Sequence, residues 1–167
     1  MRVAVTGTPG TGKTTATERV DALDVLHLNE VIEREGFDTG RDAERGSLVA
    51  DTDALAAWLD GRDDVVVESH LAHLFSADRV VVLRCHPDEL AERLEARGES
   101  DAKMRENAEA EALDVVLSEA VAEHGRDRVY EIDTTGRDPE AVAADIEAVI
   151  AGEREPSAGT VDFTGWL

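Results

Sequence analysis

Short hydrophobic runs alternate along this chain with longer stretches in which hydrophobic residues recur every third or fourth position. The short runs predict buried strands, and the longer stretches predict amphipathic helices. This alternation predicts an α/β fold, a five-stranded, mostly parallel sheet with helices on both faces. We expect strands at Arg2–Thr6, Asp24–Leu28, Val65–Glu68, Arg79–Arg84 and Arg128–Ile132. We expect helices at Lys13–Ala22, Asn29–Glu35, Thr52–Leu59, Pro87–Arg97, Ala102–His124 and Pro139–Ala151.

Two stretches interrupt the alternation. Gly36–Val49 is polar, contains glycine and carries charges of both signs, and Gly98–Ala102 separates two charged helices. Such places suit mobile segments that close over a bound substrate. The end of the chain contains Pro and Gly but also carries Phe163 and Trp166, which a frayed tail would not need. We therefore expect one domain, residues 1–152, and a tail, residues 153–167, that docks on the domain or on a partner.

The charge of the chain is extreme, with 38 acidic against 17 basic residues and a formal net charge of −21. Lys13 and Lys103 are its lysines, and the other basic residues are arginines. A composition with many carboxylates and almost no lysine resembles that of cytosolic proteins from salt-accumulating archaea. Concentrated salt screens the repulsion on such an acidic surface and keeps the protein soluble. The charge argues against tight binding to nucleic-acid phosphates, whereas a basic protein partner is compatible with it.

Composition also bears on the compartment. Hydrophobic runs fall well short of the ~20 residues of a membrane span, and Met1 leads straight into a strand rather than a signal peptide. Cys85 is the one cysteine, so neither an internal disulfide nor a zinc-binding cysteine cluster is available. We expect a cytoplasmic protein without a membrane partner.

Residues Gly7–Thr14, GTPGTGKT, fit the phosphate-loop pattern G-x-x-x-x-G-K-[ST] between a predicted strand and a predicted helix. Gly10 and Gly12 allow the backbone to wrap around a phosphate, with successive N–H groups pointing inward. Lys13 can reach the β- and γ-phosphates, and the Thr14 hydroxyl can ligate Mg²⁺. The loop predicts binding of a nucleoside triphosphate.

The third predicted strand ends in Glu68-Ser69-His70. A carboxylate at such a strand end is placed to hold the water shell of Mg²⁺, so we assign Glu68 to the metal through water. His70 is expected to orient a water or a phosphate, although it could instead be a loop or helix-capping histidine.

Arginines stand where a phosphate clamp would be useful, because guanidinium binds phosphate bidentately and stays charged. Since arginine replaces lysine throughout this chain, each one taken alone could equally be a surface residue. Arg84 and Arg97 are the stronger candidates, because they lie at the open edge of the predicted sheet. Candidates near the first mobile stretch are Arg41 and Arg45.

Several segments together resemble a known family. They are GTPGTGKTT, the ESH strand end, VVVLR, ERLEARG and KMRENAEAEALDVVLSEA. These look like the adenylate kinase isoenzyme 6 family, whose eukaryotic members are also known as the coilin-interacting nuclear ATPase and as a small-subunit rRNA-processing factor. The resemblance runs along essentially the whole chain. The phosphate loop is shared with many families, whereas the ESH and ENxExE elements are more specific.

The resemblance implies a P-loop fold and a broad-specificity nucleoside monophosphate kinase that converts ATP and AMP to two ADP, with ATPase activity and a role in late small ribosomal subunit maturation. It also implies a small-subunit platform ribosomal protein as partner. The monophosphate-binding segment would be about residues 29–51, and the lid about residues 96–106. By matching motifs, ATP would be held by Gly10, Gly12, Lys13, Thr14, Thr15 and the lid residue Arg97, with Thr135 and Gly136 near the adenine.

The chain departs from the family pattern twice. The family usually has D-x-H where this chain has Glu68-Ser69-His70, and many members carry an aromatic residue where it has Glu99. Both departures bear on catalytic efficiency rather than on the fold. Two other functions stay open: an ATPase assembly factor with incidental kinase turnover, and a small-metabolite kinase of the shikimate or gluconate type.

Overall fold

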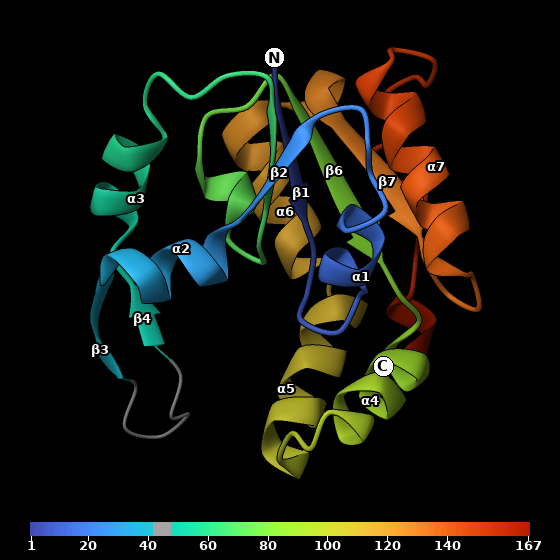
Figure 1. Ribbon diagram of the computed structural model, residues 1–167. Helices are drawn as coiled ribbons and strands as arrows, with labels where there is room; N and C mark the ends of the chain where they lie inside the picture. The colour runs from blue at the N-terminus through green and yellow to red at the C-terminus, as the bar shows by residue number, and fades with distance from the viewer. Residues whose placement is uncertain (42–47) are drawn as a thin grey trace.

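A five-stranded parallel sheet organises the molecule, as seen in the computed structural model, which describes residues 1–41 and 48–167 (Figure 1). The strand order is β2-β5-β1-β6-β7, and every neighbouring pair is parallel. The carboxyl ends of these strands therefore meet at one edge, where the phosphate loop lies. The strands are β1 (Arg2–Thr6), β2 (Asp24–His27), β5 (Val65–Glu68), β6 (Arg79–Arg84) and β7 (Val129–Asp133).

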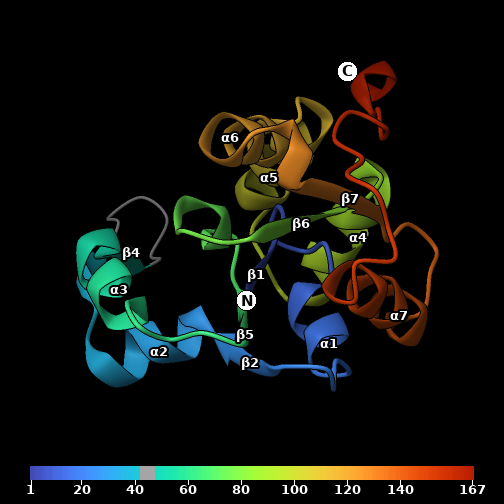
Figure 2. The ribbon, with the colours of Figure 1, turned by 90° about the horizontal axis from the view of Figure 1, so that it is seen from above.

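Helices cover both faces of the sheet (Figure 2). On one face α1 and α7 pack against side chains such as Val3, Val5 and Val81, and on the other α2, α3 and α6 pack against Ala4 and Val80. Each strand thus sends alternate side chains into two separate cores. Among the described residues, no helix is long and apolar enough to cross a membrane. The helices are α1 (Lys13–Thr17), α2 (Leu28–Glu35), α3 (Thr52–Leu59), α4 (Pro87–Ala96), α5 (Asp101–Ala112), α6 (Val115–His124) and α7 (Pro139–Ile150).

The predicted sheet is confirmed, with strand bounds that differ from the sequence-based ones by at most one residue at an end. Pro87 and Pro139 stand in the first turn of their helices, and Gly125 caps the C-terminus of α6. The pattern of apolar runs was sufficient here because both faces of a parallel sheet are buried.

Two helix predictions were wrong. The helix predicted over Lys13–Ala22 ends at Thr17, and the chain continues in tight turns in which the Val20 amide donates to the Thr17 carbonyl. The helix predicted over Ala102–His124 is two helices, broken at Asp114, whose φ is 57°. Aspartate tolerates this left-handed conformation, and its carboxylate is drawn inward to Arg84, 2.6 Å away.

Between α2 and α3, a stretch predicted only as a polar mobile segment contains two short antiparallel strands, β3 (Asp38–Arg41) and β4 (Leu48–Ala50). β3 is polar throughout and β4 is three apolar residues long, so neither gives an alternating pattern from which a strand could be inferred. Arg45 lies outside the described residues, and Arg41 is described only in its backbone.

The C-terminal tail runs back along β7 (Figure 2). The Ser157 amide donates to the Val129 carbonyl, and the Glu131 amide donates to the Ser157 hydroxyl. Further on, the Trp166 indole N–H donates to Asp88 Oδ1 at 2.8 Å, at the start of α4. The tail therefore contacts both the edge strand and the helix that leads to the predicted lid.

Candidate active site

The phosphate loop joins β1 to α1 at the carboxyl edge of the sheet. A side chain at Gly7 would put its Cβ 2.7 Å from the Leu83 carbonyl oxygen, so β6 leaves no room for one. Gly12 precedes α1 with a φ of 94°, a conformation that L side chains rarely adopt. The loop can thus take this path against the sheet only with glycine at these positions.

Lys13 is buried beneath the loop, where its Nζ donates to the carbonyls of Gly7 at 2.9 Å and Thr8 at 3.2 Å. Burial lowers the pKa of Lys13 to about 8, and the positive charge of Arg97 acts in the same direction. The carboxylates of Glu68 and Glu111 oppose that shift. A phosphate beside this ammonium would favour its charged form, so the group is well suited to respond to an anionic ligand.

Glu68 ends β5 with a side chain that is buried from solvent. Its Oε1 accepts a hydrogen bond from Thr14 Oγ1 at 2.9 Å and lies 2.8 Å from His27 Nδ1. His27 is the residue of β2 that pairs with Glu68 across the two strands. The sheet register therefore places the histidine beside the carboxylate.

A cavity of about 360 Å³ opens in front of these groups. Its lining includes Lys13 and Thr14 at the start of α1 and Glu68 at the end of β5. His70, just after β5, and Arg97, just after α4, also line it. Burial lowers the pKa of His70 to about 4, with a further contribution from the charge of Lys13. His70 is therefore a neutral imidazole near pH 7, able to accept a hydrogen bond as well as donate one.

The oxygen ligands in this cavity fit Mg²⁺. Thr14 offers a hydroxyl and Glu68 a carboxylate, and the two oxygens lie 2.9 Å apart. Mg²⁺ is commonly held by one or two protein oxygens together with water and substrate phosphates. The same oxygen, Glu68 Oε1, lies within hydrogen-bond distance of both Thr14 Oγ1 and His27 Nδ1.

A second cavity, of about 280 Å³, adjoins the first on the side of α7. Its lining includes Gly12, Thr15, Arg93 and Thr134. Thr135 and Gly136, expected near the adenine, follow Thr134 in the β7–α7 connection. The Gly136 amide donates to the Glu89 carboxylate at 3.0 Å, and the Thr135 hydroxyl donates to Asp133.

Arg84 does not have the setting expected of a substrate ligand. It is fully buried, and its guanidinium contacts Glu111 at 3.3 Å, Glu131 at 3.1 Å and Asp114 at 2.6 Å. Each guanidinium nitrogen donates to one of these carboxylates. The carboxylates raise its pKa against the opposing effect of burial. Its position at the strand end was predicted correctly, but the surrounding acids turn the side chain inward and satisfy it there.

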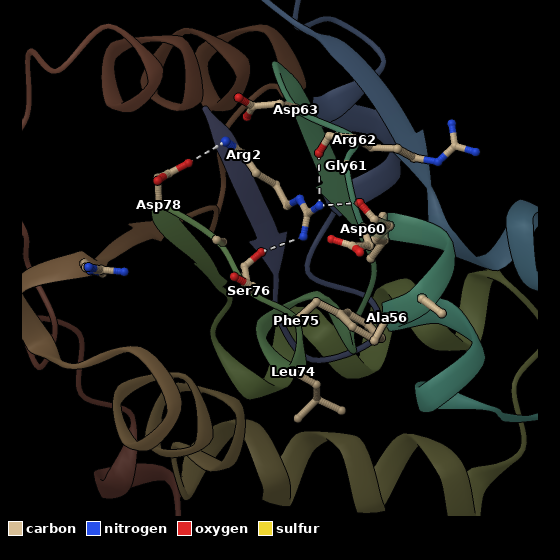
Figure 3. Close-up of a pocket in the computed structure, with 14 residues that line it drawn as sticks. Arg2, Ala56, Asp60, Gly61, Arg62, Asp63, Leu74, Phe75, Ser76 and Asp78 are labelled. Carbon is tan, nitrogen blue, oxygen red and sulfur yellow. Dashed lines mark hydrogen bonds between the residues drawn. The ribbon is translucent and has the colours of Figure 1, made fainter.

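A larger cavity, of about 600 Å³, lies at the opposite end of the sheet, around Arg2 (Figure 3). The Arg2 guanidinium donates to the carbonyls of Ser76, Leu59 and Arg62, so it ties together the connections that enter β5 and β6. Ligands of open α/β sheets bind at the carboxyl ends of the strands. We therefore assign the chemistry to the phosphate-loop edge.

Sequence reasoning missed several residues of the site. His27 could have been found by noting that it ends the strand before the one that ends in Glu68. Arg93 precedes Arg97 by one helical turn and so shares its face of α4, which is a signal for a second basic group. Glu111 was noticed only as the last residue of the ENxExE element, and nothing in that charged helix indicated that it is buried.

The chain is similar to known proteins along its whole length. A family profile described as "AAA domain" matches residues 3–114. A protein of Natronomonas pharaonis named "Putative adenylate kinase" is 73% identical over the whole of both chains. Proteins with the same name from Halobacterium salinarum and Methanothermobacter thermautotrophicus are 63% and 48% identical, over 100% and 99% of this chain and 100% and 98% of their own.

Solved structures share the fold at low sequence identity. Shikimate kinase from Acinetobacter baumannii, in complex with shikimate, superposes with a TM-score of 0.66 at 17% identity, covering 92% of this chain and 94% of that chain. A sugar kinase from Janibacter gives a TM-score of 0.60 at 16% identity, covering 90% and 94%. The chain has the P-loop kinase fold and is a phosphotransferase. It belongs to the family of these archaeal proteins named as putative adenylate kinases.

Proposed function

We propose that this chain is a broad-specificity nucleoside monophosphate kinase that transfers the γ-phosphoryl group of ATP to AMP. The observation that carries the proposal is the cavity in which Lys13, Glu68, His70 and Arg97 converge in front of the phosphate loop. Transfer of a phosphoryl group needs positioning and neutralisation of charge rather than a covalent intermediate. The two cations, Lys13 and Arg97, and a magnesium-compatible oxygen pair supply what that chemistry needs.

Each residue then has a role. The loop amides from Gly10 to Thr15 would bind the β-phosphate, and Lys13 would neutralise charge on the β- and γ-phosphates. Arg97 would approach the migrating phosphoryl group from the lid. Thr14, and Glu68 through water, would hold Mg²⁺, which when bound draws negative charge from the phosphate oxygens.

The acceptor would bind on the β2 side of the cavity. We propose residues 29–51 as the monophosphate-binding segment, with Arg41 and Arg45 as its phosphate ligands, and residues 96–106 as the lid. Asn29 supports this, because it follows β2 and lines the cavity beside Glu68. Thr135 and Gly136 would border the adenine of ATP, beside the cavity near Arg93. Closure of both segments would exclude water from the transfer.

A second activity, hydrolysis of ATP, is favoured by one specific observation. His70 lines the same cavity as Lys13, and burial lowers its pKa to about 4, so its neutral ring would be able to accept a hydrogen bond from a water there. We propose that His70 and Glu68 orient this water when no acceptor is bound. An ATPase cycle of this kind fits an assembly factor for the small ribosomal subunit of the adenylate kinase isoenzyme 6 type, with a basic platform ribosomal protein as partner. The formal charge of −21 suits such a partner in a salt-rich cytoplasm.

A coupled assay in high salt, with ATP and Mg²⁺ in the presence and absence of AMP, tests the proposal. We expect AMP to raise ADP formation well above a slower background of ATP hydrolysis, which releases phosphate without AMP. His70→Ala should reduce phosphate release more than kinase turnover, and equal losses would refute the separate role of His70. If the rate of phosphate release is unchanged by AMP and increases when a platform ribosomal protein is added, the assembly-factor function is the primary one.

The same assay distinguishes a nucleoside monophosphate kinase from a small-metabolite kinase. Shikimate and gluconate are offered in place of AMP, with nucleotide consumption as the readout. Turnover with either, and none with any nucleoside monophosphate, would overturn the proposed substrate class while leaving the fold and the ATP site untouched.

A further inference from the structure

Glu111 is a buried acid that the proposed chemistry does not use. It is 2% exposed and lies near the end of α5, the helix that follows the lid. Its Oε1 accepts a hydrogen bond from the Thr8 hydroxyl at 3.0 Å. Its Oε2 accepts from the Cys85 amide at 2.7 Å and from Arg84 Nε at 3.3 Å.

These contacts join three elements at one carboxylate. Thr8 belongs to the phosphate loop, Cys85 follows β6, and Glu111 itself is in α5. The backbone carbonyl of Glu111 also accepts from Arg84 Nη2 at 3.1 Å, so the end of α5 is fixed at both its main chain and its side chain. Asp114, just beyond it, is held by the same guanidinium.

Thr8 is a central residue of the loop. Its carbonyl accepts from the Thr11 amide at 3.2 Å, the Thr11 hydroxyl at 2.8 Å and Lys13 Nζ at 3.2 Å. A shift of Thr8 would therefore disturb both the turn that shapes the phosphate cradle and the partner that directs the lysine. Because a cradle built from backbone amides depends on their direction, small changes in this turn weaken phosphate binding.

We infer that Glu111 is a positioning residue: through the Thr8 hydroxyl it fixes the phosphate loop and ties that loop to the helix behind the lid. The inference rests on the proposed binding of ATP by this loop. A carboxylate serves because it accepts from a hydroxyl, an amide and a guanidinium at once, as no neutral side chain of its size can.

Binding of ATP to the full-length protein, measured by calorimetry, tests the inference without relying on turnover. We expect Thr8→Val and Glu111→Ala each to raise the dissociation constant roughly tenfold, the loss expected for one charge-assisted hydrogen bond. The double variant should bind no more weakly than Glu111→Ala, because both substitutions break the same connection. Glu111→Gln keeps one acceptor oxygen and should recover much of the affinity. The KM for AMP should stay within twofold of wild type.

Asp114→Asn is the matched control, since it weakens a contact to the same guanidinium without touching the loop. It should lower stability while leaving ATP affinity within twofold. Additive losses in the double variant, or an equal loss of affinity in Asp114→Asn, would overturn the inference. If Glu111→Ala does not fold, Thr8→Val is compared with Thr8→Ser, which keeps the hydroxyl that donates to Glu111; equal ATP affinity in the two variants would overturn the inference. Wild-type protein that binds ATP but does not phosphorylate AMP would contradict the proposed function and leave this inference intact.

Discussion

His27 Nδ1 and Glu68 Oε1 lie 2.8 Å apart, at paired positions of two adjacent parallel strands. The same Glu68 oxygen accepts from Thr14, so the histidine orients the carboxylate toward the phosphate loop. Groups that orient a metal-binding carboxylate contribute to metal affinity without touching the metal.

We therefore expect His27→Ala to raise the Mg²⁺ concentration for half-maximal activity by about 10-fold or more. Titration of activity with Mg²⁺ at saturating ATP measures this. His124→Ala is a matched control, because His124 contacts the His73 carbonyl and lies away from the loop. An unchanged magnesium requirement in His27→Ala would show that Glu68 does not depend on this neighbour.

Lys13→Met should abolish phosphoryl transfer and yet stabilise the nucleotide-free protein. Burial lowers the pKa of Lys13 from its ordinary value of 10.5 to about 8. Between these values the unfolded chain binds more protons, so this group makes wild-type stability rise as the pH rises from about 8 to 10.5. The Met variant lacks that rise.

Urea unfolding at about pH 7.5 and about pH 10 measures both effects of Lys13→Met. At the lower pH the variant should be more stable by on the order of 2 kcal/mol, and the difference should shrink at the higher pH. The rate should fall at least about 100-fold, as when one transition-state donor is removed. A variant whose turnover is close to that of the wild type would contradict the assignment of the phosphate loop.

Cys85 should resist alkylation in the folded protein. It is fully buried, and burial is the main cause that raises its pKa to about 12. Because the thiolate is the reactive form, iodoacetamide at about pH 8 should modify native protein at least roughly a thousandfold more slowly than protein in urea. The rate, followed by mass spectrometry, then reports opening of the structure. Fast labelling of protein that remains folded would contradict the burial of this thiol.

Loss of the tail should destabilise the domain, because a buried carboxylate would lose its hydrogen-bond donors. Glu131 is buried and accepts from the amides of Gly159 and Thr160. Deleting residues 157–167 should lower the free energy of unfolding by about 3 kcal/mol, because a buried carboxylate oxygen loses its partners. Trp166→Ala removes a single exposed hydrogen bond to Asp88 and should cost about 1 kcal/mol.

Urea unfolding of the deletion and of Trp166→Ala measures these costs. Thr164→Ala serves as the control, because its hydroxyl donates to Asp162, within the tail, and it should change stability by less than about 0.5 kcal/mol. A deletion that leaves stability unchanged would show that the tail contacts do not hold Glu131 in solution.

The sequence by itself determined the sheet and the phosphate loop. Strands buried on both faces contain continuous apolar runs, such as Val80–Leu83 in β6, and glycines such as Gly12 occur where the backbone needs them. These are local requirements, because the strand pattern depends on burial of neighbouring residues and the loop on backbone conformation. Both are written in consecutive residues.

Only the tertiary structure decided the partners of the charged side chains. In a chain with 38 acidic residues, no spacing distinguishes Glu111, buried against the loop, from an exposed neighbour such as Glu109. Arg84 lies at the expected strand end, yet three acids enclose its guanidinium. They are Glu111 in α5, Asp114 between α5 and α6, and Glu131 in β7. The physical reason is that a charge can be buried only where distant segments bring its counter-charges together, and that meeting is decided by packing rather than by local pattern.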